Sequence, residues 1–169
     1  PPSDSFFSRL GNLITSPGKA MEGVKAKPRW LQAGLLIMVV MALFVATTLH
    51  ISGPEEMEML KEGRFGEMMP QDVWQQRYDE SLDPSLGARI GSGLARAAWL
   101  WILVLFVPAL VWLLFSKLAG GAASFSQVMG VVFWAEVIGF VLGTLVRWPW
   151  VFVQQTSIGV ATGPAIFAS

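Results

Sequence analysis

Glu136 is the residue whose side chain is most indicative of chemistry, because it is a charged group inside an apolar run, residues 128–146. A carboxylate in membrane hydrocarbon costs about 3 kcal/mol or more unless it is protonated or paired. Gly139 and Gly143 follow three and seven residues later, on nearly the same helical face, where small residues let another helix approach closely. The pattern predicts a proton or ion relay, or a polar contact to a partner subunit. The alternative is a protonated glutamic acid that bonds one neighbouring hydroxyl or carbonyl group.

A second candidate chemistry is the binding of a soft metal ion by thioether and imidazole groups, which Cu(I) accepts. The candidate ligands are His50, Met57, Met59, Met68 and Met69. Methionine is also a flexible apolar filler, and some of these residues could line an interfacial helix. The acidic residues of the same region lack the spacing of a calcium loop. We therefore predict no metal and no other cofactor, and these five residues remain the alternative.

The composition excludes most other chemistry. The chain has no Cys and a single His, which removes thiolate and multi-histidine metal sites as well as Cys nucleophiles. Twelve basic residues balance twelve acidic ones, so the chain lacks the basic surplus of a nucleic-acid-binding protein. Of the 169 residues, 53% are apolar and 14% are charged, which is typical of a membrane protein. We predict a membrane protein that is not an enzyme and binds no nucleic acid.

Three apolar runs are each long enough to cross a membrane, because about twenty helical residues cover the roughly 30 Å hydrocarbon core. They lie at about residues 30–50, 97–116 and 128–147. A fourth run, residues 158–169, is too short to cross alone and is predicted to be the start of another span. The predicted fold is an all-α integral membrane protein, a helical bundle with three full spans and part of a fourth. Residues 30–169 form this membrane domain, with an outer loop at residues 51–96.

Residues 1–29 are predicted to form amphipathic helices at the membrane surface. Apolar side chains recur at intervals of three and four from Phe6 to Ile14, which aligns them on one helical face. Ser16 and Pro17 are typical of a second helix start, and a proline after Lys27 should end that helix. Five basic residues of this segment are candidates for contact with anionic lipid or a partner: Arg9, Lys19, Lys25, Lys27 and Arg29. The alternative is a soluble amphipathic helix that packs on a partner protein.

The distribution of charge predicts the orientation of the chain. Residues 1–29 carry five basic side chains against two acidic ones, whereas residues 51–96 carry nine acidic side chains against five basic ones. The excess of positive charge near the first span predicts a cytoplasmic amino terminus. Arg147 falls on the outer side and departs from this rule. The expected location is the inner membrane of a bacterium.

Two passages of the sequence resemble a known family. They are FSRL and LITSPGKA, at residues 7–10 and 13–20, and the hairpin GGAASFSQ, at residues 120–127. The hairpin contains Gly120 and Gly121, which permit a tight reversal, and then Ser124 and Phe125, of which the serine can cap the incoming helix. These passages resemble bacterial members of the Yip family, named for Ypt-interacting protein. The family has a cytoplasmic amino terminus and a five-helix membrane domain, so the resemblance implies that this chain covers only part of it.

The resemblance implies a membrane-embedded interaction protein. In the family, eukaryotic members act in vesicle traffic and some bacterial members accompany ABC-type exporters. We therefore predict a non-enzymatic accessory or scaffold subunit of an inner-membrane assembly, with the lipid bilayer and other membrane protein subunits as partners. The alternative is a small transporter or channel component that uses Glu136 as its coupling acid.

Overall fold

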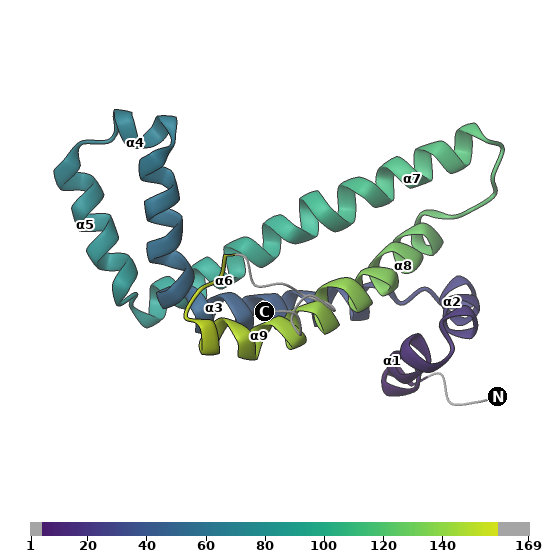
Figure 1. The fold of residues 1–169 in the computed structure, drawn as a ribbon. Helices are drawn as coiled ribbons and strands as arrows, with labels where there is room; N and C mark the ends of the chain where they lie inside the picture. The colour runs from purple at the N-terminus through teal and green to yellow at the C-terminus, as the bar shows by residue number, and fades with distance from the viewer. Residues whose placement is uncertain (1–4, 159–169) are drawn as a thin grey trace, which may run out of the picture. The chain divides into compact units, whose positions relative to one another are not determined.

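The computed structural model describes residues 5–158, and every regular element among them is helical. Two short helices come first, α1 (Phe6–Thr15) and α2 (Pro17–Ala26), followed by the long helix α3 (Trp30–Glu62). Two short helices follow, α4 (Arg64–Met68) and α5 (Gln71–Leu82). The remaining elements form two long runs, each with a π-helical segment inside it: α6 (Leu86–Leu100), η1 (Trp101–Phe106) and α7 (Val107–Leu118), then α8 (Phe125–Glu136), η2 (Val137–Leu142) and α9 (Gly143–Gln154) (Figure 1).

Three helical runs are long and apolar enough to cross a membrane: Trp30–Glu62, Leu86–Leu118 and Phe125–Gln154. At about 1.5 Å per residue, each exceeds the roughly 30 Å hydrocarbon core. The prediction of an all-α membrane protein with three full spans is confirmed. Of the predicted fourth span, residues 159–169 lie outside the described part of the chain. The predicted outer loop, residues 51–96, is helical over most of its length.

The two amino-terminal helices begin and end where the sequence predicts, with one difference at a cap. The hydroxyl of Ser5 accepts from the amide of Ser8, 3.1 Å away, and so caps α1. Ser16 occupies the N-cap position of α2 with Pro17 behind it, but its side chain makes no capping hydrogen bond. The start of α2 therefore depends on the preset backbone of the proline rather than on a serine cap.

Each of the two later runs changes to π geometry within its apolar stretch, which the sequence analysis did not predict. The amide of Val107 donates to the carbonyl of Ile102, five residues back, at the end of η1. Pro108 follows at once, and since proline has no N–H it leaves a carbonyl of the preceding turn without its usual partner. η2 begins directly after Glu136 and contains no proline.

The described residues form two compact units, and each is described by itself. The first comprises residues 5–41 and 96–142, and the second comprises residues 42–95 and 143–158. In the first unit, α2 and α7 both contact α8. Its largest fully buried side chains are Trp134, Phe133, Ile37, Leu105 and Met129. The core of this unit therefore joins the amino-terminal helices to the three apolar runs.

In the second unit, α9 and α6 pack against the later part of α3. The rings of Phe44 and Trp148 meet edge to face, with their centroids 5.7 Å apart. A Cβ atom at Gly93 of α6 would lie 2.6 Å from the carbonyl oxygen of Ala42, so only glycine permits this approach. Small residues thus set the helix spacing, as expected where close packing must replace the hydrophobic effect.

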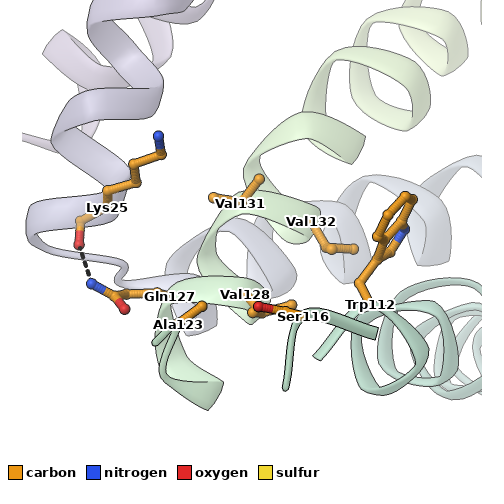
Figure 2. Close-up of a pocket in the computed structure, with 8 residues that line it drawn as sticks. All are labelled: Lys25, Trp112, Ser116, Ala123, Gln127, Val128, Val131 and Val132. Atoms are coloured by element: carbon orange, nitrogen blue, oxygen red, sulfur yellow. Dashed lines mark hydrogen bonds between the residues drawn. The ribbon is translucent and has the colours of Figure 1, made fainter. Parts of the chain in front are cut away.

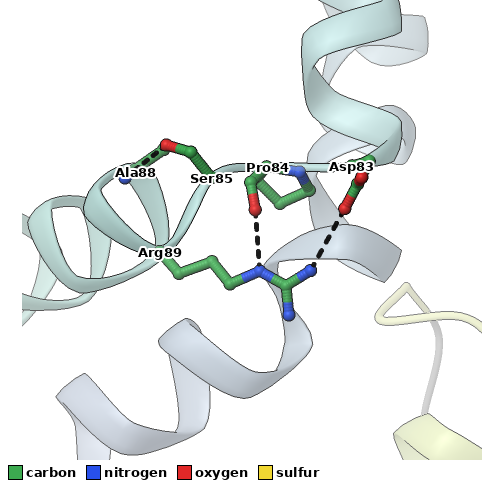
Figure 3. A network of polar contacts seen from close by, with 5 residues as sticks. All are labelled: Asp83, Pro84, Ser85, Ala88 and Arg89. Atoms are coloured by element: carbon green, nitrogen blue, oxygen red, sulfur yellow. Dashed lines mark hydrogen bonds and ion pairs between the residues drawn. The ribbon is translucent and has the colours of Figure 1, made fainter.

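A polar turn joins α5 to α6 in the same unit. Nε of Arg89 donates to the carbonyl of Pro84 at 2.9 Å, and its Nη2 lies 3.6 Å from a carboxylate oxygen of Asp83 (Figure 3). The hydroxyl of Ser85 accepts from the amide of Ala88 at 3.2 Å, which caps the first turn of α6. These contacts fix where the second apolar run begins.

Candidate functional site

The best-built polar site of the first unit lies where the amino-terminal helices meet α8. Arg9 of α1 is 4% exposed, and its Nη1 donates to the carbonyl of Lys27 at 2.7 Å. The guanidinium carbon of Arg9 lies 5.3 Å from the centroid of the Trp134 ring. Nε1 of Trp134 donates in turn to the carbonyl of Pro28 at 3.0 Å. One basic and one aromatic side chain thus hold the segment between α2 and α3 against α8.

A capping box continues this contact at the start of α8. The hydroxyl of Ser124 accepts from the amide of Gln127 at 3.3 Å, and the amide of Ser124 donates to Oε1 of Gln127 at 3.0 Å. Nε2 of Gln127 donates to the carbonyl of Lys25 on α2 at 3.3 Å. Farther along α8, a Cβ at Gly130 would lie 2.6 Å from Cβ of Pro28. Gln127 and Gly130 therefore both contribute to the packing of α2 against α8.

An aromatic cluster around Trp30 packs next to this site. Its ring centroid lies 5.5 to 6.4 Å from those of four other rings: Trp101, Phe106, Phe125 and Phe133. Nε1 of Trp101 donates to the carbonyl of Gly34 at 2.8 Å. A Cβ at Gly34 would lie 2.6 Å from the Phe133 ring, so α3 can approach this cluster only with glycine there.

The predicted hairpin residues all lie in the link between α7 and α8. Gly120 has φ 78°, a left-handed backbone that glycine adopts without strain. The amide of Gly121 donates to the carbonyl of Ser116 at 2.7 Å, and a Cβ at Gly121 would lie 2.7 Å from the same oxygen. Ser124 caps α8 as the spacing predicts, and Phe125 joins the aromatic cluster. The hairpin brings the ends of α7 and α8 together.

A groove of about 390 Å³ opens between α7 and α8 beside this hairpin, with α2 at its edge (Figure 2). The apolar part of its lining consists of Val128, Val131, Val132, Ala123 and Trp112. The three polar lining residues are Ser116, Gln127 and Lys25. The Gln127 amide points to the backbone carbonyl of Lys25, while the ammonium end of Lys25 extends away from that hydrogen bond (Figure 2). Among the described residues, the Lys25 ammonium has no ion-pair partner. The groove thus has an apolar wall and one unpaired positive charge.

The structure separates the five predicted basic residues into two kinds. Arg9 is buried within the chain and bonded to it, as described above. The other four are exposed: Lys19, Lys25, Lys27 and Arg29. The proposal of contact with lipid or a partner therefore depends on these four.

Glu136 closes α8 and is half-buried. Within residues 5–158 its carboxylate has neither a hydrogen-bond nor an ion-pair partner, and the only atom near a Cβ built at Gly139 is Oε2 of Glu136, at 3.4 Å. A Cβ at Gly143 would meet nothing within 4 Å. Gly139 in the first unit and Gly143 in the second therefore each have space for a close contact.

A family model for the Yip1 domain matches residues 11–168, nearly the whole chain. The chain belongs to the Yip1 domain family. This confirms the predicted family over a range that includes the passage at residues 13–20 and the hairpin, and a family of membrane proteins agrees with the three long apolar helices. No curated protein and no solved structure matches the chain.

In this Yip1 domain the histidine and methionine residues are spread over several elements. His50 and Met57 lie seven residues apart on α3, about 10.5 Å along the helix axis. The ring of His50 lies beside that of Phe152, with their centroids 6.2 Å apart. Met59 and Met68 are exposed, and Met69 is the C-cap residue that follows α4. Within the described residues, no group of three or more His, Cys, Asp or Glu side chains could hold a metal ion.

The acidic region of this Yip1 domain forms a contact between α3 and α5. Nε1 of Trp74 donates to the carbonyl of Met57 at 3.2 Å, and Nζ of Lys61 lies 4.2 Å from the centroid of the Trp74 ring. The hydroxyl of Tyr78 donates to the carboxylate of Glu58 at 3.2 Å. This hydrogen bond, with partial desolvation and nearby negative charge, raises the pKa of Tyr78 above its ordinary value. These aromatic side chains thus bind residues of α3 in their own chain.

The sequence analysis of this Yip1 domain missed three residues that build the site. Gln127 had a visible signal, since it stands three residues after Ser124 in a capping-box pattern. Gly130 and Trp134 had none, because their roles depend on contacts with Pro28 more than a hundred residues away.

Proposed function

We propose that this Yip1-domain protein is a non-enzymatic accessory or scaffold subunit of a membrane protein assembly, such as an exporter. One observation carries the proposal. In the most apolar stretch of Leu86–Leu118, 11% of the residues are buried within the chain, against 33% and 39% in the other two candidate spans. A span so little covered by its own chain leaves its apolar surface free for the helices of partner subunits.

Within the first unit this span includes η1 and α7, and Ala109 is the one buried residue of α7. Its exposed large side chains are aromatic or aliphatic: Val107, Leu110, Val111, Trp112, Leu114, Phe115 and Leu118. Tryptophan and other aromatic residues supply much of the contact energy at protein interfaces. In a membrane such a surface associates with another helix by van der Waals packing. We assign α7 as the main partner surface.

Two further partner contacts are assigned, one to the open space at Gly139 in the first unit and one to that at Gly143 in the second. Small residues let the backbone of another helix approach closely, and these glycines have space for it.

We place the protein in a bacterial inner membrane with its amino terminus in the cytoplasm, because residues 1–29, before the first span, carry more basic than acidic side chains.

Site-specific photo-crosslinking in native membranes tests the proposal. A photoreactive residue replaces Phe115 on α7 in one variant and Leu35 on α3 in the other, because both side chains are 60% exposed. We expect Phe115 to crosslink to a defined membrane protein that also copurifies in mild detergent, and Leu35 to crosslink mainly to lipid. Lipid adducts alone at both positions would overturn the proposal.

A second candidate function, a small transporter or channel component, is favoured by the carboxylate of Glu136. An acid inside a span without a partner in the described chain is a candidate for carrying a proton or an ion. Replacement of this acid by glutamine separates the two functions, as argued in the Discussion.

A further inference from the structure

The groove between α7 and α8 has the composition of a lipid site rather than of a site for a polar ligand. Three valines of α8 form one wall, and Trp112 of α7 forms part of the other (Figure 2). A cavity of about 390 Å³ is within the range of small-ligand sites. Its polar lining residues come from three helices: Lys25 from α2, Ser116 from α7 and Gln127 from α8. A ligand that fits must therefore be mostly apolar with a negatively charged end.

The position of the groove along the chain points to the membrane–water boundary. Trp112 and Ser116 lie near the end of the second candidate span, Leu86–Leu118, and Gln127 lies near the start of the third, Phe125–Gln154. From Gln127 to Val132 the groove follows α8 for five residues, about 7.5 Å along the axis. This depth holds the upper part of an acyl chain, with the headgroup at the level of the hairpin.

The charge around the groove selects an anionic headgroup. Residues 5–29 carry five basic side chains and one acidic side chain, Glu22. Of the basic residues, Lys25 is the one that lines the groove, and its ammonium has no ion-pair partner among the described residues. Basic residues close to a membrane attract anionic lipid. A lipid of no net charge carries its own cation beside its phosphate, so it attracts the lysine less strongly than an anionic lipid does.

We propose that this groove binds one anionic phospholipid of the cytoplasmic leaflet, with an acyl chain against Val128, Val131 and Val132 and the phosphate at Lys25. The bound lipid bridges α2 and α7, two helices that both pack on α8. It therefore helps to hold the amino-terminal helices against the membrane domain. The choice of leaflet rests on the cytoplasmic amino terminus proposed above. Trp112 lines the groove and also belongs to the α7 surface assigned to partners, so the lipid is tested on the isolated protein.

Native mass spectrometry of the intact protein in mild detergent tests the lipid and the lysine. The probes are phosphatidylglycerol and phosphatidylcholine with identical acyl chains. We expect one phosphatidylglycerol to be retained in preference to phosphatidylcholine. Lys25→Gln should weaken its retention about fivefold, roughly the effect of one basic residue near an anionic surface. The hydrogen bond from Gln127 survives this change because its acceptor is the backbone carbonyl of Lys25.

Lys19→Gln is the matched control, because it removes the same charge from the same helix at an exposed residue that does not line the groove. We expect it to retain the lipid almost as the unchanged protein does. Equal retention of the two lipids, or equal losses in the two lysine variants, would overturn the proposal in favour of general attraction to the surface.

A second pair of variants tests the acyl-chain wall without any change of charge. Ala123 lines the groove and Ala122 does not. Ala123→Phe should fill the groove and displace the lipid, whereas Ala122→Phe, at the exposed neighbouring residue of the hairpin, should not. Retention unchanged by Ala123→Phe would show that no acyl chain occupies the groove.

Discussion

The guanidinium of Arg9 lies 5.3 Å from the centre of the Trp134 ring, although 125 residues separate them in the chain. Arg9 also donates to the carbonyl of Lys27, and Trp134 donates to the carbonyl of Pro28. The two side chains thus act on adjacent carbonyls of the segment between α2 and α3. This pair fixes the amino-terminal helices to the third candidate span.

Removal of the Arg9 side chain should release α1 from α8. A buried charged hydrogen bond and a cation–π contact together predict a loss of about 2–3 kcal/mol for Arg9→Ala. We expect hydrogen exchange of residues 5–27 in nanodiscs to accelerate by at least about tenfold, in line with that loss. Lys19→Ala, at an exposed residue, is the control and should leave exchange unchanged. Protection that persists in Arg9→Ala would mean that other contacts hold α1.

Gly130 should tolerate no side chain. Its Cβ would lie 2.6 Å from Cβ of Pro28 and 3.1 Å from Val24, so Gly130→Ala must push α2 away from α8. We expect a loss of about 1–3 kcal/mol in thermal unfolding in detergent, the usual cost of overpacking. Gly143→Ala is the matched control, because nothing lies within 4 Å of its Cβ. If both variants unfold at the same temperature, α2 does not depend on this close approach.

The sequence predicted the parts of this fold that depend on local pattern. Apolar runs of about twenty residues indicated the three spans, and Ser124 and Gly120 indicated the hairpin, because length, capping and turn geometry are local properties. The burial of Arg9 could not be predicted, since a basic residue on an amphipathic helix normally faces water or headgroups. Only its distant partners make burial favourable.

The π-helical segments show the same limit. η1 stands before Pro108, so a change in the helix could be expected there, and the sequence pattern did not specify π geometry. η2 has no proline and no other local signal. The sequence analysis placed Glu136 and Gly139 on nearly the same face by assuming 100° per residue. Because Gly139 lies in the π-helical segment η2, that spacing does not apply strictly there.

The titration of Tyr78 should report the contact between α3 and α5. It is the single tyrosine of the chain, so phenolate absorbance belongs to it alone. The hydrogen bond to Glu58 raises the pKa of Tyr78 above about 10, which means that the contact stabilises the fold below that pH and is lost as the pH rises through the higher value.

Glu58 and Glu62 offer a matched pair of carboxylates for this titration. Glu58→Ala should lower the pKa of Tyr78 toward its ordinary value, because the acceptor and its negative charge are both removed. Glu62→Ala removes a carboxylate that lines the same surface but does not bond Tyr78. Equal shifts in the two variants would indicate general electrostatics rather than the hydrogen bond.

The replacement Glu136→Gln should separate a scaffold from a transporter, and it should not destabilise the protein. Its carboxylate has no partner among residues 5–158, so loss of the charge breaks no contact there. We expect thermal stability in detergent to stay within about 0.5 kcal/mol of the unchanged protein. By contrast, Glu55→Ala should cost about 1–2 kcal/mol, because the Glu55 carboxylate accepts hydrogen bonds from Thr156 and Ser157 after α9.

Functional assays of Glu136→Gln then distinguish an accessory subunit from a transporter. In an accessory subunit, Glu136→Gln should leave both the ratio of copurified partner and the activity of the assembly unchanged, because contact through α7 needs no carboxylate. In a proton- or ion-coupled transporter, the same variant should assemble normally yet lose coupled transport, since glutamine cannot release a proton. Proton flux into proteoliposomes, measured for the unchanged protein and for Glu136→Gln, decides between these outcomes. Flux abolished by this single substitution would replace the scaffold proposal with the transporter.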